Sequence, residues 1–266
     1  MATVRPASVA GTFYPADPAV LRRSVEDLLR DGSESELGIR PSLLIVPHAG
    51  YVYSGLVAAS AYRLLRDVGD ALRRVVLVGP AHFVAPSGLA TPGVDALETP
   101  LGEVPVDTEL TASAHSHPIV GPDPVAHARE HSLEVQLPFL QVVIPEFSVL
   151  ALVTGNVGPD AAADVLDEVI AADDVIGIVS SDLSHYLDYD AARRRDTRTA
   201  TAITELRPAD LSPGDACGRT AVQAALVLAK RRGWTCRLID LRNSGDTAGS
   251  MHQVVGYGAF AVGPKI

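Results

Sequence analysis

The stretch LLIVPHAGYVYSG (residues 43–55) combines a short apolar run with a turn that carries His48. Short apolar runs bounded by turn residues are typical of strands that are buried on both faces of a sheet. The same pattern returns in VVLVGPAH, where an apolar run over residues 75–78 leads to His82. Both histidines are therefore expected where a buried strand ends and a loop begins.

A third apolar run, VIGIV (residues 175–179), leads through SSDLSH to Asp182 and His185. Helical patterns separate the three runs, and strands that alternate with helices are typical of α/β folds with a parallel sheet. The carboxyl ends of such strands share one edge of the sheet, where open α/β sheets bind ligands. The pattern therefore predicts an α/β fold with helices on both faces and a metal centre at this edge.

Helical spacing, capping residues and apolar runs predict the other elements. Helices are expected at residues 18–30, 54–66, 107–115, 159–172, 190–205 and 220–231. Strands are expected at residues 43–46, 75–78, 149–153, 175–179, 235–241 and 254–262. Two prolines make residues 99–106 an irregular or edge segment, and residues 130–144 are interpreted as a helix interrupted at Pro138. No change of composition divides the chain, so we expect a single domain over residues 1–266.

The composition limits the classes of partner. The chain has 266 residues, of which 47 % are hydrophobic and 20 % charged, as in compact folded proteins. Its formal net charge of −10 would repel nucleic acid and anionic membranes, so we expect neither as a partner. A basic cluster at residues 193–195 is interpreted as helix surface. No apolar stretch approaches the roughly 20 residues that span a bilayer, and two cysteines are too few for a disulfide framework. We expect a cytoplasmic protein.

Eight histidines are present, and most of them have an ordinary interpretation. His115, His117 and His127 lie in polar or proline-rich stretches and are expected at the surface. The motif EHSLE (residues 130–134) places three ionisable groups within five residues, and the following QLPFL indicates that this segment packs tightly. We therefore expect one of its members, His131, to face inward.

The two cysteines differ in their context. Cys217, in DACGRTA, precedes a predicted helix, and a helix N-terminus favours the thiolate that binds metal. A small buried apolar residue is an equally good interpretation of Cys217, and the spacing does not decide between the two. Cys236 lies within a predicted strand and is interpreted as a buried apolar residue. Phosphate-binding, dinucleotide-binding and nucleophile-elbow motifs are absent from the sequence.

The motifs together resemble the Memo family, the B protein of bacterial and archaeal AmmeMemoRadiSam systems. The resemblance runs nearly from end to end of the chain. Its motifs, in order, are AGTFYPAD, VPHAGYVYSG, GPAH, TPLGEV, EHSLEVQLPFL, SSDLSHY, ACGR, and the late SGD with VVGYGA. Each motif alone is a weak signal, but the ordered set is highly specific.

This resemblance implies a three-layer α/β/α fold, with a parallel or mixed central sheet, similar to the class III extradiol dioxygenases. It also implies a metal held by His48, His82 and Cys217, with Asp182 and His185 close by. Iron and copper are both associated with the family. A functional link to AMMECR1-like and radical SAM proteins follows from the family name.

The leading hypothesis is a metal-dependent oxidoreductase that acts on a small-molecule substrate, with Fe(II) as the expected metal and copper or zinc as alternatives. Asp182 either completes the metal's ligand set in place of Cys217 or orients a ligand. His131 or His185 would act as general acid or base, because an imidazole titrates near neutral pH. The alternatives are a non-enzymatic metal- or peptide-binding redox or adaptor protein, and a zinc-dependent hydrolase.

Overall fold

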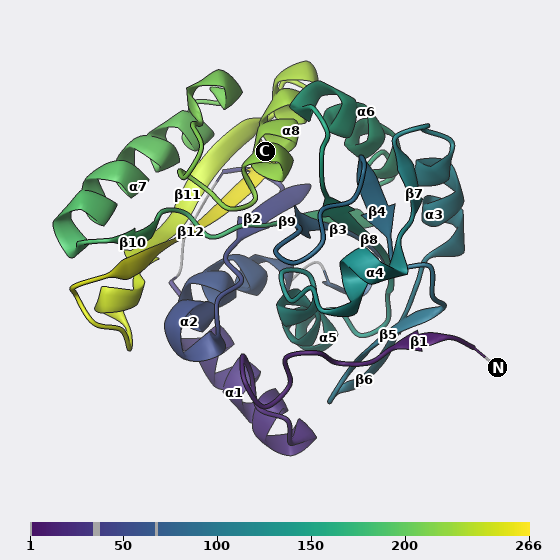
Figure 1. Cartoon of the computed structure of the whole chain (residues 1–266), viewed down its shortest axis with the longest axis horizontal. Coiled ribbons are helices and arrows are strands. Elements are labelled where there is room, and N and C mark those ends of the chain that lie inside the picture. The colour runs from purple at the N-terminus through teal and green to yellow at the C-terminus, as the bar shows by residue number, and fades with distance from the viewer. Residues whose placement is uncertain (1, 34–37, 67–68) are drawn as a thin grey trace.

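The computed structural model describes residues 2–33, 38–66 and 69–266 (Figure 1). The strands of its main sheet are β2 (Leu43–Val46), β3 (Arg74–Pro80), β4 (Leu89–Thr91), β7 (Val120–Pro122), β8 (Ser148–Thr154), β9 (Val175–Ser180), β10 (His185–Leu187), β11 (Thr235–Asn243) and β12 (Val254–Gly263). Their order in the described part of the chain is β10-β12-β2-β9-β3-β8-β4-β7, with β11 paired to β12. The sheet is mixed, because β2, β9, β3 and β8 are parallel to one another while β12 is antiparallel to β2.

A smaller sheet lies beside the main one. It contains β1 (Val4–Arg5), β5 (Ala96–Thr99) and β6 (Gly102–Pro105), in the order β1-β5-β6. The expected edge segment is therefore an antiparallel hairpin, in which Pro100 lies in the turn and needs no ladder hydrogen bond. The sequence pattern did not predict the small sheet itself, since its partner strand comes from the N-terminus.

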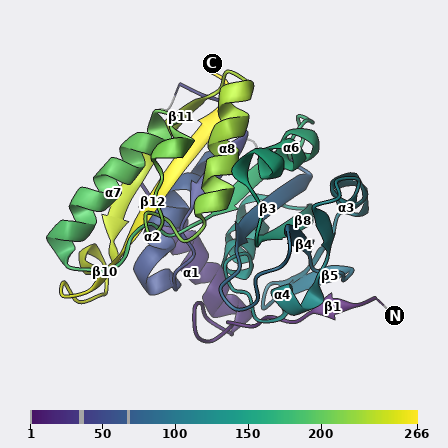
Figure 2. The same ribbon diagram turned by 45° about the horizontal axis from the view of Figure 1, so that its top comes forward.

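Helices cover both faces of the main sheet. They are α1 (Pro18–Asp31), α2 (Tyr51–Tyr62), α3 (Thr108–His115), α4 (Pro124–Ala128), α5 (Leu137–Val143), α6 (Pro159–Val169), α7 (Tyr189–Thr204) and α8 (Arg219–Arg231). Buried side chains of α1, α2 and α5 form one core with one face of the sheet, and those of α3, α6, α7 and α8 form another core with the opposite face. Figure 2 shows α7 and α8 in front of β11 and β12, with α1 and α2 behind. The fold is thus the expected three-layer α/β arrangement.

The middle of the sheet explains the position of the candidate site. Strand β9 lies between β2 and β3, and all three run in the same direction. Val46 at the end of β2 pairs with Ser180 at the end of β9, while Val78 near the end of β3 pairs with Val179. The loops that follow the three strands therefore leave the sheet at one edge, which confirms the expectation from the apolar runs.

The segment that carries His131 differs from the expectation. The structure has a 3₁₀ turn at residues 134–136 and then α5, with Pro138 in the first turn of that helix, where its missing N–H is not needed. His131 precedes both and is not helical. The carboxylate of Glu130 accepts hydrogen bonds from a nearby backbone N–H and from the loop after β3, and these contacts hold the segment in an irregular conformation. The helical prediction was wrong here.

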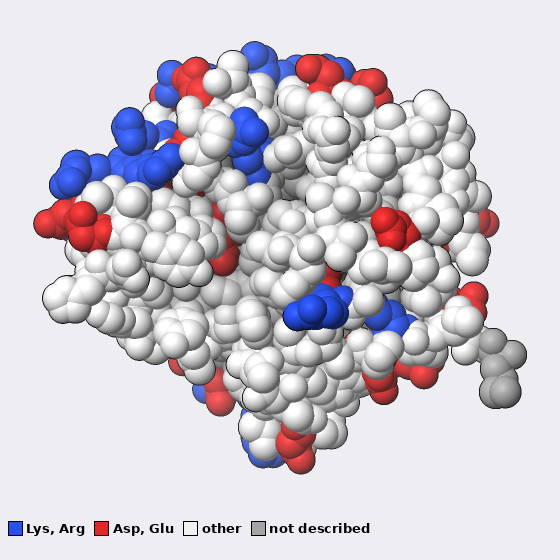
Figure 3. Space-filling model, viewed as in Figure 1, with Lys and Arg blue, Asp and Glu red and all other residues white. Residues whose placement is uncertain are grey.

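On the face seen in Figure 3, most charged side chains lie toward the rim, and a smaller number of basic and acidic side chains lie near the centre. Basic groups are concentrated over α7, where Arg193 and Arg194 are exposed. Arg193 lies over the ring of Tyr189, and Arg195 is paired with Asp215 at 2.7 Å. These contacts agree with the interpretation of this cluster as helix surface. No helix in the described part of the chain is both long and apolar enough to cross a membrane.

We predict that Ile178→Ala lowers the free energy of unfolding by about 2–5 kcal/mol, because Ile178 in β9 is fully buried and its truncation leaves a cavity in the core. Urea unfolding followed by circular dichroism measures this change. Leu238→Ala, at a position 40 % exposed on β11, is the matched control and should change stability by much less. An equal loss in both variants would contradict the assigned core.

Candidate metal centre

Three histidine rings meet at the carboxyl edge of the main sheet. His48 follows β2, His82 follows β3, and His131 precedes α5. One ring nitrogen of each lies within 4.8 Å of those of the other two, and the ring centroids are 4.5–5.6 Å apart. His48 is buried, whereas the side chains of His82 and His131 are 28 % and 15 % exposed to solvent. The cluster is therefore open to solvent on the side of His82 and His131.

A chain of hydrogen bonds fixes the tautomer of His48. The amide nitrogen of Gln136 donates to the hydroxyl of Ser180 at 2.8 Å, and that hydroxyl donates its single proton to the carbonyl oxygen of Ser132 at 2.6 Å. The Ser180 oxygen can therefore only accept from Nδ1 of His48, 2.9 Å away. In the neutral ring, the lone pair then lies on Nε2. Burial, followed by the charges of the neighbouring histidines, lowers the pKa of His48 well below its usual value, so the ring is neutral at pH 7.

A carboxylate fixes the tautomer of His82. Glu130 accepts from Nδ1 of His82 at 2.8 Å and from its backbone N–H at 2.6 Å. Burial opposes ionisation of Glu130, but the hydrogen bonds from His82 and from the N–H of Ser132 outweigh it and lower the pKa of Glu130 to about 2. In the neutral imidazole, Nε2 of His82 again carries the lone pair. Carboxylate–histidine pairs of this kind are typical of metal sites, since they orient the ligand and raise its basicity.

His131 is held by packing more than by hydrogen bonds. Its ring lies 4.8 Å from that of Phe13 and 6.2 Å from that of Phe83. Nδ1 of His131 is 3.6 Å from Glu130, which is too long for a hydrogen bond. Burial and the nearby His82 lower the pKa of His131, so its ring is neutral near pH 7. A neutral imidazole can bind a metal ion or accept a proton.

Cys217 lies beside His48, just before α8. Its Sγ is 3.2 Å from Nε2 of His48 and accepts the backbone N–H of Asp182 at 3.2 Å. Burial and then the neighbouring Asp182 carboxyl raise the pKa of Cys217 to about 12, so the thiol is protonated unless a cation stabilises the thiolate. Cys236 is also buried, and it lies in β11, as its apolar interpretation predicted.

Asp182 and His185 lie in the segment that follows β9, at the same edge of the sheet. Oδ1 of Asp182 accepts the backbone N–H of His48 at 2.8 Å, and burial raises the pKa of this carboxyl. Nδ1 of His185 donates to the carbonyl oxygen of Leu183 at 2.9 Å, which leaves its Nε2 available. The charge of His185 influences the pKa values of both Asp182 and His48. The structure thus groups His48, His82 and His131, with Cys217 and Asp182 in contact with His48.

Some residues near the site differ from the sequence-based expectation. His127 was expected at the surface but is buried, where its Nε2 donates to the carbonyl oxygen of Ala90 at 2.7 Å and burial lowers its pKa to about 4. The contributions of Glu130, Ser180 and Gln136 were not predicted. A polar residue inside an apolar run is the signal that would have drawn attention to Gln136.

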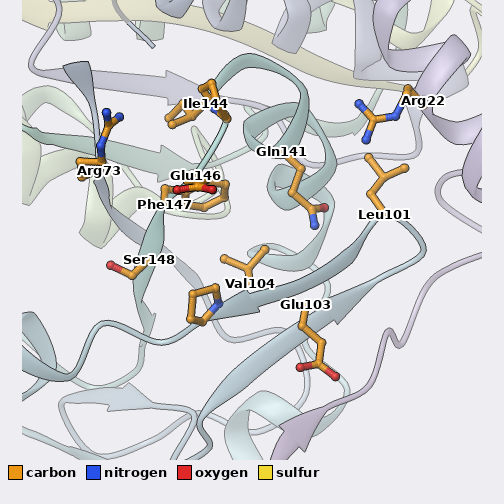
Figure 4. Close-up of a pocket in the computed structure, with 12 residues that line it drawn as sticks. Arg22, Arg73, Leu101, Glu103, Val104, Gln141, Ile144, Glu146, Phe147 and Ser148 are labelled. Carbon is orange, nitrogen blue, oxygen red and sulfur yellow. The ribbon is translucent and has the colours of Figure 1, made fainter. Parts of the chain in front are cut away.

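A hollow of about 600 Å³ lies at the opposite end of the sheet, between α5, β6 and the start of β8 (Figure 4). Its walls mix basic, acidic and apolar side chains, including Arg22, Glu103, Glu146 and Phe147. None of the residues predicted from the sequence as site residues lines this hollow. Among the described residues, the group that could hold a metal ion is the histidine cluster at the carboxyl edge, and imidazole nitrogens suit Zn, Fe or Cu.

Comparison with known proteins identifies the family. Residues 5–261 match the model of the Memo-like protein family. A MEMO1 family protein of Aquifex aeolicus is 37 % identical over 96 % of this chain and 97 % of its own length. MEMO1 family proteins of Methanopyrus kandleri and Archaeoglobus fulgidus are 36 % and 35 % identical, over 96 % and 94 % of this chain and 98 % and 95 % of their own lengths. The chain therefore belongs to the Memo family.

Proposed function

We propose that the protein is a metal-dependent oxidoreductase with one metal ion at the carboxyl edge of the main sheet. The observation that carries this proposal is the cluster of three imidazoles, because His48 and His82 each have Nδ1 engaged in a hydrogen bond and therefore carry the lone pair of the neutral ring on Nε2. The same proposal includes a fold similar to the class III extradiol dioxygenases. It also includes a cytoplasmic location and a functional link to AMMECR1-like and radical SAM proteins.

His48, His82 and Cys217 are the proposed ligands. Metal–nitrogen and metal–sulfur bonds of about 2.0–2.3 Å allow one ion to contact both Nε2 of His48 and Sγ of Cys217, which are 3.2 Å apart. His131 is the competing third ligand, because it belongs to the same cluster. Asp182 holds the backbone at His48 and contributes negative charge close to the ion when it is ionised.

The proposed metal is Fe(II), which would supply one-electron chemistry and open positions for dioxygen and a small-molecule substrate. The protein's own groups would orient the substrate and move protons. His131, with its lowered pKa and its partly exposed ring, can accept a proton from a bound substrate, and His185 can do so through its available Nε2. Copper is an alternative metal. Zinc, which a thiol ligand also suits, would instead support hydrolysis.

We predict that His48→Ala, His82→Ala and Cys217→Ala each abolish tight metal binding while the fold stays intact. Each substitution removes one donor atom from the proposed set. Metal content after anaerobic loading with Fe(II), measured together with circular dichroism, checks the outcome. Cys236→Ala is the control and should bind metal as the wild type does.

His131→Ala decides between the competing third ligands in the same measurement. If His131 moves protons and Cys217 binds the ion, His131→Ala retains the metal and Cys217→Ala loses it. The opposite result would assign the third position to His131. Undiminished metal content in all four site variants would refute the centre.

Glu130→Gln should weaken metal binding by about 10- to 100-fold, because the neutral amide no longer raises the basicity of His82. Titration of the metal-free protein with Zn²⁺, using a competing chelator, measures the affinity. Glu168→Gln is a matched control, since Glu168 also accepts a hydrogen bond from a histidine, His117, at 2.8 Å, but on the outer surface. Equal affinities in the two variants would show that the carboxylate beside His82 does not support a metal.

The Fe(II)-loaded protein should consume oxygen when it meets a suitable substrate from a panel of aromatic and small polar molecules. His131→Ala should reduce that rate by about 100-fold or more if His131 is the acid or base. An oxygen electrode measures the rate. Stoichiometric zinc after native purification, with no iron under anaerobic conditions, would favour hydrolysis. No oxygen consumption with any compound of the panel would favour a binding or adaptor protein.

A further inference from the structure

Residues 5–14, here called the N-terminal arm, enclose the side chain of Glu134. This carboxylate is fully buried and accepts hydrogen bonds from the backbone N–H groups of Ser8 and Val9 and from the hydroxyl of Tyr14, over 2.6–3.0 Å. In the described part of the chain, every side-chain hydrogen bond of Glu134 comes from the arm. Glu134 is therefore the anchor that holds the arm in place.

One guanidinium from the arm contacts both sides of His131. Nε of Arg5 donates to the carbonyl oxygen of His127 at 2.7 Å, and its Nη2 donates to that of Glu130 at 2.6 Å. Its Nη1 forms a buried ion pair with Glu134 at 2.8 Å. Three points of the segment that carries His131 are thus fixed by a single rigid, planar group.

The arm also touches the segment that carries His48. The backbone N–H of Tyr51, three residues after His48, donates to the carbonyl oxygen of Phe13 at 2.8 Å. The ring of Phe13 packs against His131, with the two centroids 4.8 Å apart. Phe13 therefore joins two histidine-bearing segments that come from different parts of the chain.

We propose that the N-terminal arm is a clasp that positions His131 and the turn after His48, and that its docking is thermodynamically coupled to metal binding at the centre. The proposal rests on the metal centre of the proposed function. If a docked arm favours the metal-competent arrangement, a bound metal must favour the docked arm by the same free energy. Arg5, Phe13 and Glu134 act through the histidines and are positioning residues.

Two variants of the full-length protein test the first direction of this coupling. Glu134→Gln removes the charge that pairs with Arg5, and Phe13→Ala removes the ring beside His131 without disturbing the buried ion pair. Titration with Co²⁺ should show affinity about 10- to 100-fold below that of the wild type in both variants, and a changed visible spectrum of the bound cobalt. Phe13→Leu, which keeps most of the packing, should restore the affinity.

Arg74→Met is the matched control. It removes an ion pair with Asp174, at 2.7 Å and 2.9 Å, at the amino end of β3, whereas the proposed metal centre lies beyond the carboxyl end of that strand. It should leave both the cobalt affinity and the spectrum unchanged. A loss of affinity in this variant equal to that in the other two would mean that general destabilisation explains the effect, and would overturn the clasp.

Hydrogen exchange tests the reverse direction. The amides of Ser8 and Val9, which donate to Glu134, should exchange more slowly in the wild type when Zn²⁺ is added, and the slowing should vanish in a His48→Ala, His82→Ala double variant. The clasp is refuted, and the metal centre stands, if two results are found together. Glu134→Gln and Phe13→Ala would bind metal as tightly as the wild type, and Zn²⁺ would not slow the exchange of the Ser8 and Val9 amides in the wild type. If the wild type binds no metal, both proposals fall.

Discussion

The parallel pairing of β2, β9 and β3 is the constraint on which the candidate site depends. Because these strands share one direction, their last residues reach the same edge, and the residues that follow them are brought together from three distant parts of the chain. The register matters as much as the direction. The pairing of Val46 with Ser180 places the Ser180 hydroxyl within reach of Nδ1 of His48. A slip of one residue would turn that hydroxyl to the other face of the sheet.

Hydrogen bonds then fix the orientation of the histidine rings that the strands bring together. Ser180 and Glu130 each accept a hydrogen bond from Nδ1 of one imidazole, so that the lone pair of the neutral ring lies on Nε2 in both His48 and His82. Buried polar groups of this kind are costly unless each has a partner. Gln136 meets that requirement by donating to Ser180 and to the carbonyl oxygen of Pro47, while its own oxygen accepts from Tyr62. The donor atoms are thus oriented before any ligand arrives.

The sequence predicted those parts of the site that depend on local pattern. The three apolar runs became strands with nearly the expected bounds, and the residues after them lie at one edge, because burial on both faces leaves a clear signal in the chain. The irregular segment around His131 was not predictable in this way, since its conformation depends on contacts from Arg5 and from the His82 loop. The prediction that His127 lies at the surface was wrong for the same reason, because the carbonyl oxygen that accepts its hydrogen bond belongs to a strand distant in the sequence.

The position of Cys217 shows why spacing alone could not choose the ligands. The family resemblance drew Cys217 into the set, and the structure places its sulfur beside His48, but the ligand role stays a prediction. Chemically, the choice has consequences. Cys217, with its raised pKa, must give up a proton before it can bind a cation, whereas the ring of His131 is already neutral near pH 7. A centre closed by the thiolate would therefore release a proton when it takes up the ion and would use an oxidisable sulfur as a ligand, whereas one closed by imidazole would need neither. In the proposed centre, the identity of the third ligand would therefore set metal preference, pH dependence and sensitivity to oxidation together.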